Sequence, residues 1–228
     1  MKSISVIFPC YNEEKNIAKQ ISSADSVLNK ITDDYEIIIV NDGSTDKSLV
    51  LLEQMAREND KIKIISHKTN LCYGETLKSG FRHATKDLIF YTSMDNQYDF
   101  SQINIFLKYI DNNDIVIGYR AQRNDPLYRI FIARTYNLLI RTLFGLQIRD
   151  IDCAFKFFNK DIIQKLNMQS RYSFIDAEIL IKAQRAGYSI KELEVRHYPR
   201  IFGSSTVGFK TIFLTLTEII KFRMGFLS

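Results

Sequence analysis

The stretch Ile37-Ile38-Ile39-Val40-Asn41-Asp42-Gly43-Ser44-Thr45-Asp46 changes character between Val40 and Asn41. Its first part is apolar at every position, which is typical of a strand buried on both faces of a parallel sheet. Its second part is polar and contains a glycine, as expected where a strand ends in a turn. Because ligands of parallel sheets bind beyond the carboxyl ends of the strands, this stretch predicts a sheet and one edge of a binding site.

The alternation of strand and helix patterns continues outward from this stretch. It predicts βαβ units and an α/β fold, with a mostly parallel sheet flanked by helices. The predicted strands are residues 4–8, 35–40, 62–66, 88–92, 114–118 and 190–198. The predicted helices are residues 13–29, 45–58, 73–84, 102–112, 127–146, 175–186 and a last one from about residue 207. We expect Thr45 and Ser101 to be helix N-caps, and we assign no element to the run 150–158.

Length and composition favour one domain. The chain has 228 residues, of which 46% are hydrophobic and 25% are charged, close to the average of globular proteins. These values exclude a disordered chain and a collagen-like repeat. No internal repeat or proline-rich linker divides the sequence, although its strand–helix rhythm changes after Gly118.

Cysteine usage and the chain ends predict a reduced, cytoplasmic protein. The three cysteines include no C-x-x-C pair, which argues against a disulfide framework and a zinc site. The N-terminus carries no signal-peptide pattern. In the apolar stretch 209–226 the longest uncharged run is 211–217, far short of the about 20 residues needed to span a bilayer.

Positive charge is concentrated in one segment. The formal net charge is +5, and residues 120–149 hold six arginines against one acid, Asp125. Arg134 and Arg141 lie seven residues apart among aliphatic and aromatic side chains, which suits an interfacial helix whose arginines reach lipid phosphates. The alternative is a solvated helix face. Nucleic-acid binding is not expected, because these arginines are interspersed with apolar residues rather than clustered in a polar groove.

Two further predicted strands also end in polar residues. The first is followed by Pro9-Cys10-Tyr11-Asn12-Glu13-Glu14, and the fourth by Ser93-Met94-Asp95-Asn96-Gln97. Acids at such ends can accept hydrogen bonds from a nucleobase or ribose, or hold a hard divalent cation. The alternative for residues 42–44 is a simple turn and cap. Neither a P-loop nor a G-x-G-x-x-G motif is present, so a phosphate site on a glycine-rich helix entry is excluded.

These motifs resemble a known family. Pro9-Cys10-Tyr11-Asn12-Glu13 and Val40-Asn41-Asp42-Gly43-Ser44-Thr45-Asp46 resemble the opening of family-2 inverting glycosyltransferases of the GT-A fold. The segments 118–120, 149–156 and 197–205 resemble the polyprenyl-phosphate branch, which includes dolichyl-phosphate mannosyltransferase. The resemblance covers residues 3–225. It implies a single domain, 1–228, with a nucleotide-sugar-binding half (1–119), an acceptor-side half (120–206) and a C-terminal amphipathic helix (207–228).

The resemblance also implies roles for individual residues. The nucleotide pocket would comprise Pro9, Tyr11, Glu13, Val40, Asp42 and Met94. The implied cofactor is Mg²⁺ or Mn²⁺, held by Asp95 and Gln97. The implied catalytic residues, which stabilise charge on the diphosphate, are Asp95, Arg120 and Arg200. The residues implied to meet the acceptor phosphate or the membrane are Arg134, Arg141, Ser204 and Ser205.

The implied reaction is sugar transfer from a GDP- or UDP-sugar to a polyprenyl phosphate, with inversion, by a protein bound peripherally to the cytoplasmic face of the membrane. A phosphate acceptor is already ionised at pH 7 and needs no general base. Two alternatives remain open: transfer to a saccharide hydroxyl in glycan or cell-wall synthesis, with Asp152 or Asp176 as base, and a nucleotide-sugar-binding protein with impaired catalysis. The second arises because Ser93 and Thr206 replace an aspartate and a lysine of the family's motifs.

Overall fold

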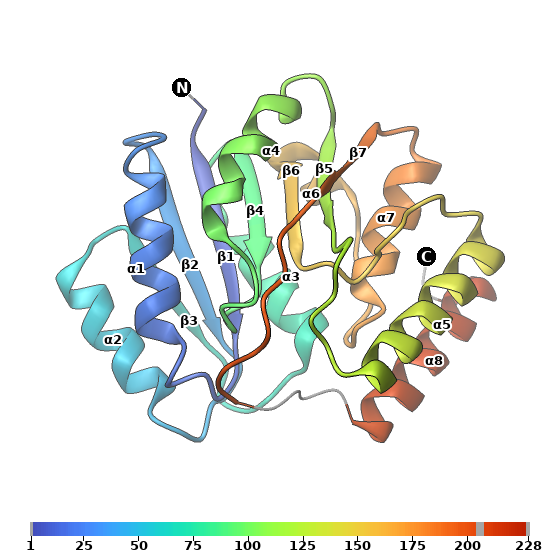
Figure 1. The fold of residues 1–228 in the computed structure, drawn as a ribbon, viewed down its shortest axis with the longest axis horizontal. Helices are drawn as coiled ribbons and strands as arrows, with labels where there is room; N and C mark the ends of the chain where they lie inside the picture. Colours follow the sequence, from blue (N-terminus) through green and yellow to red (C-terminus); the bar gives the residue numbers. More distant parts are fainter. Residues whose placement is uncertain (1, 204–207, 227–228) are drawn as a thin grey trace.

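One seven-stranded sheet forms the centre of the protein (Figure 1). The computed structural model describes residues 2–203 and 208–226. The strand order is β3-β2-β1-β4-β6-β5-β7, and only β6 runs antiparallel to its neighbours. The strands are β1 (Ile4–Cys10), β2 (Tyr35–Asn41), β3 (Ile62–Ser66), β4 (Leu88–Thr92), β5 (Ile115–Tyr119), β6 (Phe155–Asn159) and β7 (Ile190–Glu194). The predicted mostly parallel α/β sheet is confirmed.

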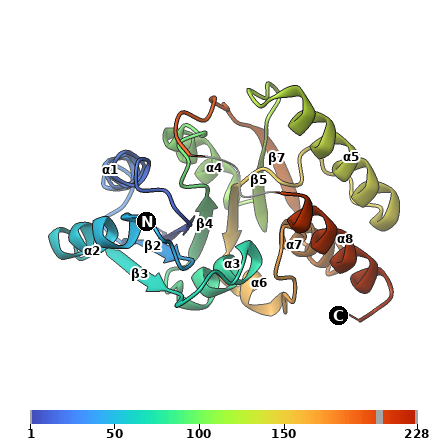
Figure 2. The ribbon, with the colours of Figure 1, turned by 90° about the horizontal axis from the view of Figure 1, so that it is seen from below.

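Helices cover both faces of this sheet (Figure 2). The core cluster on one face includes side chains of α1 (Ile17–Leu28), α2 (Ser48–Glu58) and α4 (Ile103–Ile110), which follows the short 3-10 helix η1 (Phe100–Gln102). The cluster on the other face includes side chains of α3 (Tyr73–His83), α5 (Leu127–Phe144), α6 (Lys160–Lys165), α7 (Ile175–Arg185) and α8 (Phe209–Arg223).

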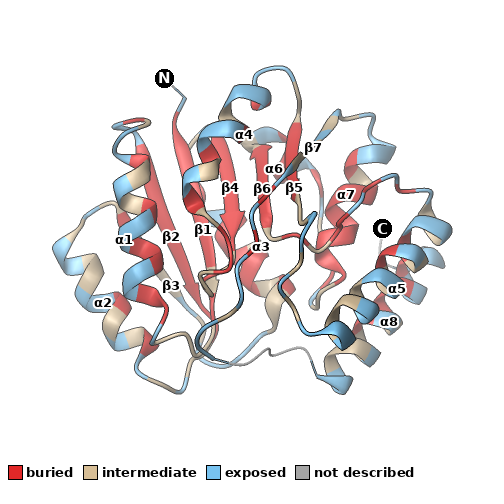
Figure 3. Cartoon of the chain, in the orientation of Figure 1, coloured by how far each residue is buried: buried red, intermediate tan, exposed pale blue. Residues whose placement is uncertain are grey.

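The continuously apolar strands have the two-sided burial that their sequence predicts. In β1, Val6 and Phe8 join one core cluster while Ile7 joins the other, and all three are fully buried. The central strands are accordingly buried along most of their length (Figure 3). Burial of apolar side chains on both faces is the main term that stabilises such a sheet.

Two parts of the predicted sheet differ from the structure. The run 150–158 was expected to hold no element, but Phe155–Asn159 form β6, inserted between β4 and β5. The last predicted strand, 190–198, ends at Glu194, because the chain leaves β5 and His197 pairs instead with Tyr98. Both differences depend on pairing with distant segments, which local sequence pattern does not report.

The two predicted N-caps are wrong. Helix α2 begins at Ser48, whose backbone N–H is bound by the carboxylate of Asp46, so Thr45 lies in the preceding loop. Asp99, not Ser101, caps η1, and its carboxylate accepts the backbone N–H of Ser101. A carboxylate satisfies a free N–H of the first turn as a hydroxyl would.

Helices α5 and α8 lie side by side beyond the β7 end of the sheet (Figures 1 and 2). Phe222 of α8 packs against Phe144 and Phe174, with ring centroids 5.6 and 5.2 Å away. One face of α8 is therefore part of the core. The opposite faces of both helices expose large apolar side chains: Leu127, Tyr128, Phe131, Ile132 and Leu138 of α5, and Phe209, Phe213, Leu216, Ile220 and Met224 of α8 (Figure 3). No helix among residues 2–203 and 208–226 is long and apolar enough to cross a membrane.

Candidate active site

The polar ends of β1, β2 and β4 meet at one edge of the sheet. β1 pairs with β2 through to Cys10 and Asn41, so the loops that follow these strands start side by side. Asn12 connects them: its side-chain oxygen accepts the backbone N–H of Thr45 at 2.8 Å, and its own N–H donates to Ser44 at 3.0 Å. Asn12 adopts a positive φ of 55°, which asparagine tolerates better than most residues. The two motifs therefore form one preorganised rim.

Glu13 is a largely buried carboxylate on this rim. Its oxygens accept hydrogen bonds from the Asn16 amide, at 2.5 Å, and from the Arg200 guanidinium. Burial raises the pKa of Glu13, and the hydrogen bond from Asn16 and the charge of Arg200 oppose that rise. A buried acid held between an amide and a guanidinium can exchange either donor for one on a ligand.

Asp95 projects from the loop after β4 toward the same place. One of its oxygens accepts the Ser93 hydroxyl at 2.6 Å and the Gln97 backbone N–H at 3.3 Å, and the other lies 3.7 Å from Arg200. In the part of the chain that the structure describes, no three His, Cys, Asp or Glu side chains gather as a metal site. One hard carboxylate oxygen fits a Mg²⁺ or Mn²⁺ ion whose other ligands are diphosphate and water.

Arg200 reaches both carboxylates from the end of a segment that we call the crossing arm, residues 195–203. Figure 1 shows this segment leaving β7 and crossing the front of the sheet toward the loop after β1. The arm is fastened midway, where Gln97 and Tyr198 exchange two hydrogen bonds of 2.8 and 3.2 Å. The Gln97 amide is thus partly committed to the arm, and its predicted metal contact is left to its oxygen.

Asp42 is almost fully buried and has protein partners on both oxygens. One accepts hydrogen bonds from the backbone N–H of Leu71, at 2.9 Å, and contacts His67 at 2.7 Å; the other accepts the N–H of Cys72 at 3.0 Å. Asp42 therefore holds the loop before α3 against the end of β2. A carboxylate has about four acceptor positions and these contacts fill three of them, so one is left for the nucleotide. The contact of Asp42 with the nucleotide stays a prediction.

Arg120 lies in a buried ion pair. Its guanidinium makes two hydrogen bonds with Asp150, of 2.6 and 2.7 Å, and both side chains are more than nine-tenths buried. Burial lowers the pKa of Arg120, whereas Tyr98 and the Asp150 carboxylate raise it. The balance holds this pKa well above its usual value. Its predicted contact with a diphosphate would require this bidentate pair to open.

The remaining predicted nucleotide residues differ in accessibility. Val40 and Met94 have side chains buried in the core, so only their backbone can meet a ligand. Pro9 and Tyr11 are partly exposed on the rim. Tyr11 is an aromatic side chain there that can face a nucleobase.

Two of the predicted acceptor residues, Arg134 and Arg141, lie on α5. Arg134 is exposed on α5, but Arg141 donates to the backbone carbonyls of Ile148 and Arg149, at 2.6 and 2.7 Å, and so fastens the loop after α5. Ser204 and Ser205 lie outside the described residues, as does Thr206. The two arginines thus have different surroundings despite sharing a helix.

The two candidate bases have unequal surroundings. Asp176 is buried in an ion pair with Lys156, which is itself fully buried, and it also accepts the Tyr91 hydroxyl. The carboxylate of Asp152 has one buried oxygen without a hydrogen-bond partner. Burial and the neighbouring Asp176 raise the pKa of Asp152 to about 7. Asp176, by contrast, is held in the core by its ion pair with Lys156.

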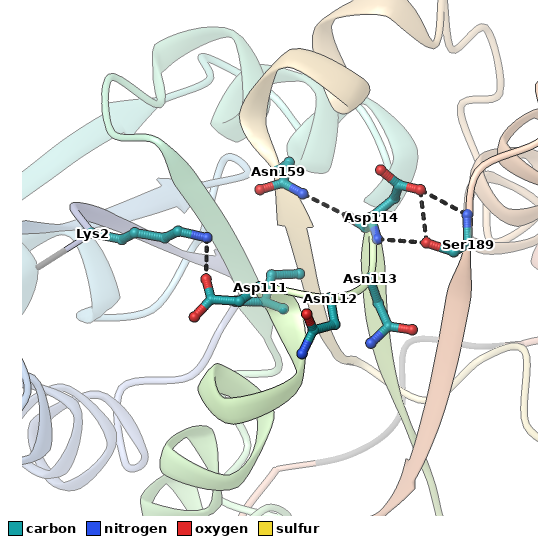
Figure 4. A pocket seen from close by; sticks show the side chains of 8 residues that line it. Lys2, Asp111, Asn112, Asn113, Asp114, Asn159 and Ser189 are labelled. Atoms are coloured by element: carbon teal, nitrogen blue, oxygen red, sulfur yellow. Dashed lines mark hydrogen bonds and ion pairs between the residues drawn. The ribbon is translucent and has the colours of Figure 1, made fainter.

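Two cavities lie at opposite ends of the sheet. One, of about 140 Å³, borders the rim between residues 12–16, Asp46, Phe202 and Gly203. The other, of about 420 Å³, is lined by Lys2, Asp114 and neighbouring polar residues at the amino-terminal end of the sheet (Figure 4). In it, Asp114 accepts the Ser189 hydroxyl at 2.7 Å, and its charged and polar side chains largely bond one another. The smaller cavity is the candidate ligand site, because ligands of parallel sheets bind at the carboxyl ends of the strands.

Three site residues have roles that the sequence did not indicate. Asn12 joins the two loops, Asn16 holds Glu13, and Asp150 holds Arg120. Asn12 and Asp150 lie inside motifs identified in the sequence, so these motifs could have indicated that both residues belong to the site. The contact of Asn16 with Asn96 across 80 residues had no local signal.

Comparison with known proteins agrees with this geometry. The family model described as glycosyl transferase family 2 matches residues 5–167. Undecaprenyl-phosphate 4-deoxy-4-formamido-L-arabinose transferases from Pectobacterium atrosepticum and Salmonella choleraesuis are each 30% identical over 224 residues, covering 96% of this chain and 67% of the relative.

Solved structures share the fold. Glucosyl-3-phosphoglycerate synthase of Mycobacterium tuberculosis, in complex with Mn²⁺, UDP and phosphoglyceric acid, superposes with a TM-score of 0.72 at 16% identity, covering 98% of this chain and 79% of that one. S. aureus TarS in complex with UDP-GlcNAc gives 0.63 at 17% identity, covering 96% and 66%. The predicted GT-A fold is confirmed. Together with the family match, these likenesses make the chain a glycosyltransferase that belongs to glycosyl transferase family 2.

Proposed function

We propose that this glycosyltransferase moves a sugar from a nucleoside diphosphate sugar to a polyprenyl phosphate, with inversion at the anomeric carbon. The observation that carries the proposal is the convergence of Glu13, Asp95 and Arg200 at the carboxyl ends of the strands. Once a divalent cation is bound at the carboxylate, that cation and the arginine are two positively charged groups that can stabilise a departing diphosphate. The relatives named for undecaprenyl phosphate support the acceptor class.

The cation in this proposal is Mg²⁺ or Mn²⁺, bound by Asp95 with the oxygen of Gln97. Such a cation supplies Lewis-acid stabilisation of the leaving diphosphate. The structures of similar fold that contain Mn²⁺ or Mg²⁺ with UDP support this assignment. Ser93 and the Gln97 backbone hold one oxygen of Asp95, which leaves the oxygen that faces Arg200 for the cation. A screen of UDP- and GDP-sugars distinguishes a uracil from a guanine nucleobase in the donor.

The surroundings of the candidate bases favour a phosphate acceptor. A saccharide hydroxyl would need a general base, and Asp176 is held by Lys156 and Tyr91 instead. Asp152 lies beside this second buried acid, and burial and Asp176 together raise its pKa to about 7. An ionised phosphate needs only to be positioned, so both acids can have structural roles.

A transfer screen tests the proposed reaction. Purified protein with Mn²⁺ is offered UDP- and GDP-sugars together with undecaprenyl phosphate in detergent, and lipid-linked sugar is measured by mass spectrometry. We expect product with one class of donor and none when the lipid lacks its phosphate. Transfer to an oligosaccharide in place of the lipid would favour the hydroxyl acceptor. Donor binding without transfer to any acceptor would favour the binding protein.

We further propose that the exposed apolar faces of α5 and α8 contact the membrane that holds this lipid, at its cytoplasmic side. Large apolar side chains make up these faces, and Arg134 and Lys210 are exposed beside them. Apolar side chains can enter the acyl boundary while arginine and lysine reach lipid phosphates. The N-terminal turns of both helices lie at the same end of the protein as the rim (Figure 1).

Arg134→Glu is expected to lower the partition of the protein into anionic vesicles by at least about tenfold, because each basic residue near such a surface contributes about 1 kcal/mol and the substitution reverses one. The measurement is flotation with phosphatidylglycerol-containing vesicles at low salt. Arg57→Glu on α2, on the other side of the sheet, is the matched control and should float like the parent. Equal flotation of the Arg134 variant and the parent would contradict membrane contact through α5.

A further inference from the structure

Arg200 lies between two carboxylates of the rim, Glu13 and Asp95. Its guanidinium contacts Glu13 through one terminal nitrogen and Asp95 through the other, at 3.7 Å, while its Nε donates to the Phe202 carbonyl at 2.8 Å. The two carboxylates belong to different loops, after β1 and after β4. A single positive charge therefore pairs with both of them and offsets part of their negative charge.

The crossing arm is held by contacts other than those that Arg200 makes with Glu13 and Asp95. His197 is buried, pairs with Tyr98, and accepts the Asn124 backbone N–H at 3.3 Å. The exchange between Gln97 and Tyr198 fastens the arm immediately before Arg200. The residues of the arm before Arg200 are thus held by other segments, so Arg200 can change partner through its own side chain and the residues that follow it.

Gly203 completes the turn that folds the arm back over Arg200. It has a φ of +76°, which side-chain-bearing residues rarely adopt, and a Cβ there would lie 2.9 Å from the terminal Arg200 nitrogen. The position of the Arg200 guanidinium therefore depends on the conformation of the arm as well as on Glu13 and Asp95.

We propose that the crossing arm is a cation-mimicking latch. In the ligand-free protein Arg200 pairs with Asp95 and Glu13, offsets part of their negative charge and disfavours metal binding. A nucleoside diphosphate draws Arg200 to its phosphates and frees the Asp95 oxygen for the cation. The latch rests on the proposed assignment of Asp95 as the cation ligand. It makes the binding of metal and of nucleotide mutually dependent, and by thermodynamic linkage each must raise the affinity of the other by the same factor.

Mn²⁺ binding to the protein without nucleotide tests the latch, with free Mn²⁺ measured by electron paramagnetic resonance. Arg200→Gln keeps a polar side chain but removes the competing charge, so we expect it to bind Mn²⁺ at least about tenfold more tightly than the parent, the range expected for one charge-assisted contact. Gly203→Ala leaves every charge in place but puts a Cβ 2.9 Å from a terminal nitrogen of Arg200, so it should shift the affinity in the same direction.

Arg196→Gln is the matched control, since it removes an exposed arginine of the same arm that lies 3.7 Å from Asp99, away from the rim. It should bind Mn²⁺ like the parent. An unchanged Mn²⁺ affinity in Arg200→Gln would overturn the latch. An equal increase in Arg196→Gln would also overturn it, because a general charge effect would then explain both variants. Neither result depends on sugar transfer, so failure of the proposed reaction remains distinguishable.

A fluorescent reporter follows the arm itself. The chain contains no tryptophan, and Phe202 is exposed next to the latch, 5.9 Å from the Lys15 ammonium. Phe202→Trp should change its emission when UDP and Mn²⁺ are added together and should not respond to Mn²⁺ alone at the same concentration. The same emission with and without nucleotide would contradict movement of the arm.

Discussion

Asp95→Ala is expected to lower the rate of sugar transfer by at least about a hundredfold, equivalent to roughly 2.7 kcal/mol of transition-state stabilisation. The substitution removes the one carboxylate at the end of β4 that faces the rim, and with it the proposed anchor for the cation that stabilises the departing diphosphate. The measurement is kcat with saturating donor and acceptor at fixed Mn²⁺.

Ser93→Ala is the matched control for this substitution. It removes a hydroxyl that only orients Asp95, at 2.6 Å, and should reduce kcat far less. EDTA should abolish transfer by the parent and by Ser93→Ala alike. Normal turnover of Asp95→Ala, insensitive to EDTA, would show that arginines alone stabilise the leaving group.

The sequence predicted the parts of this fold that depend on local pattern. The strands that became β1 to β5 were placed correctly to within two residues, because continuous apolar runs between polar turns report burial on both faces. Strand β6 was missed because its neighbours β4 and β5 are distant in sequence and β6 joins them antiparallel. Only tertiary pairing shows that this run belongs to the sheet.

The site was predictable in position but not in pairing. The motifs located Glu13, Asp95 and Arg200, and the structure brings these three together. Nothing local in the sequence indicated that the arm would return across 187 residues to meet Glu13. Likewise, Arg120 sits in the predicted motif, but its commitment to Asp150 follows from burial, which requires a partner for each charge.

The structure also separates residues that the sequence treated alike. Asp152 and Asp176 were equivalent candidates for a base, yet only Asp176 has a buried lysine as its partner. Arg134 and Arg141 were predicted to share a membrane-facing role, yet Arg141 fastens a loop through two carbonyls. In both cases the deciding factor is a partner from another element, which a helix or turn pattern does not contain.

Asp176→Asn is expected to lower the free energy of unfolding by about 3 kcal/mol or more, because breaking a buried ion pair leaves the other charge uncompensated. The lysine in question, Lys156, is fully buried on β6, and it also donates to the Tyr91 hydroxyl at 2.7 Å. The measurement is urea unfolding at pH 7 of the parent and the variant.

Asp152→Asn is the matched control, and its effect depends on pH. The folded-state pKa of Asp152 is about 7, above its ordinary value of 3.8. Between these pH values the folded protein holds more protons than the unfolded chain, so this carboxyl makes the free energy of unfolding fall as pH rises from about 4 to 7. Asparagine does not titrate. The variant should therefore lack that part of the decline, and its stability relative to the parent should increase up to pH 7.

The two substitutions should not be additive. When Asp176 is replaced alone, Lys156 still attracts Asp152, and the loss of the neighbouring negative charge removes one cause of its raised pKa. Asp152 can then ionise and partly neutralise the lysine. In the Asp152→Asn background this compensation is absent, so Asp176→Asn should cost more there than in the parent, by at least about 1 kcal/mol for interacting charges. Equal costs in the two backgrounds would show that Asp152 and Lys156 do not interact, and that the buried lysine depends on Asp176 alone.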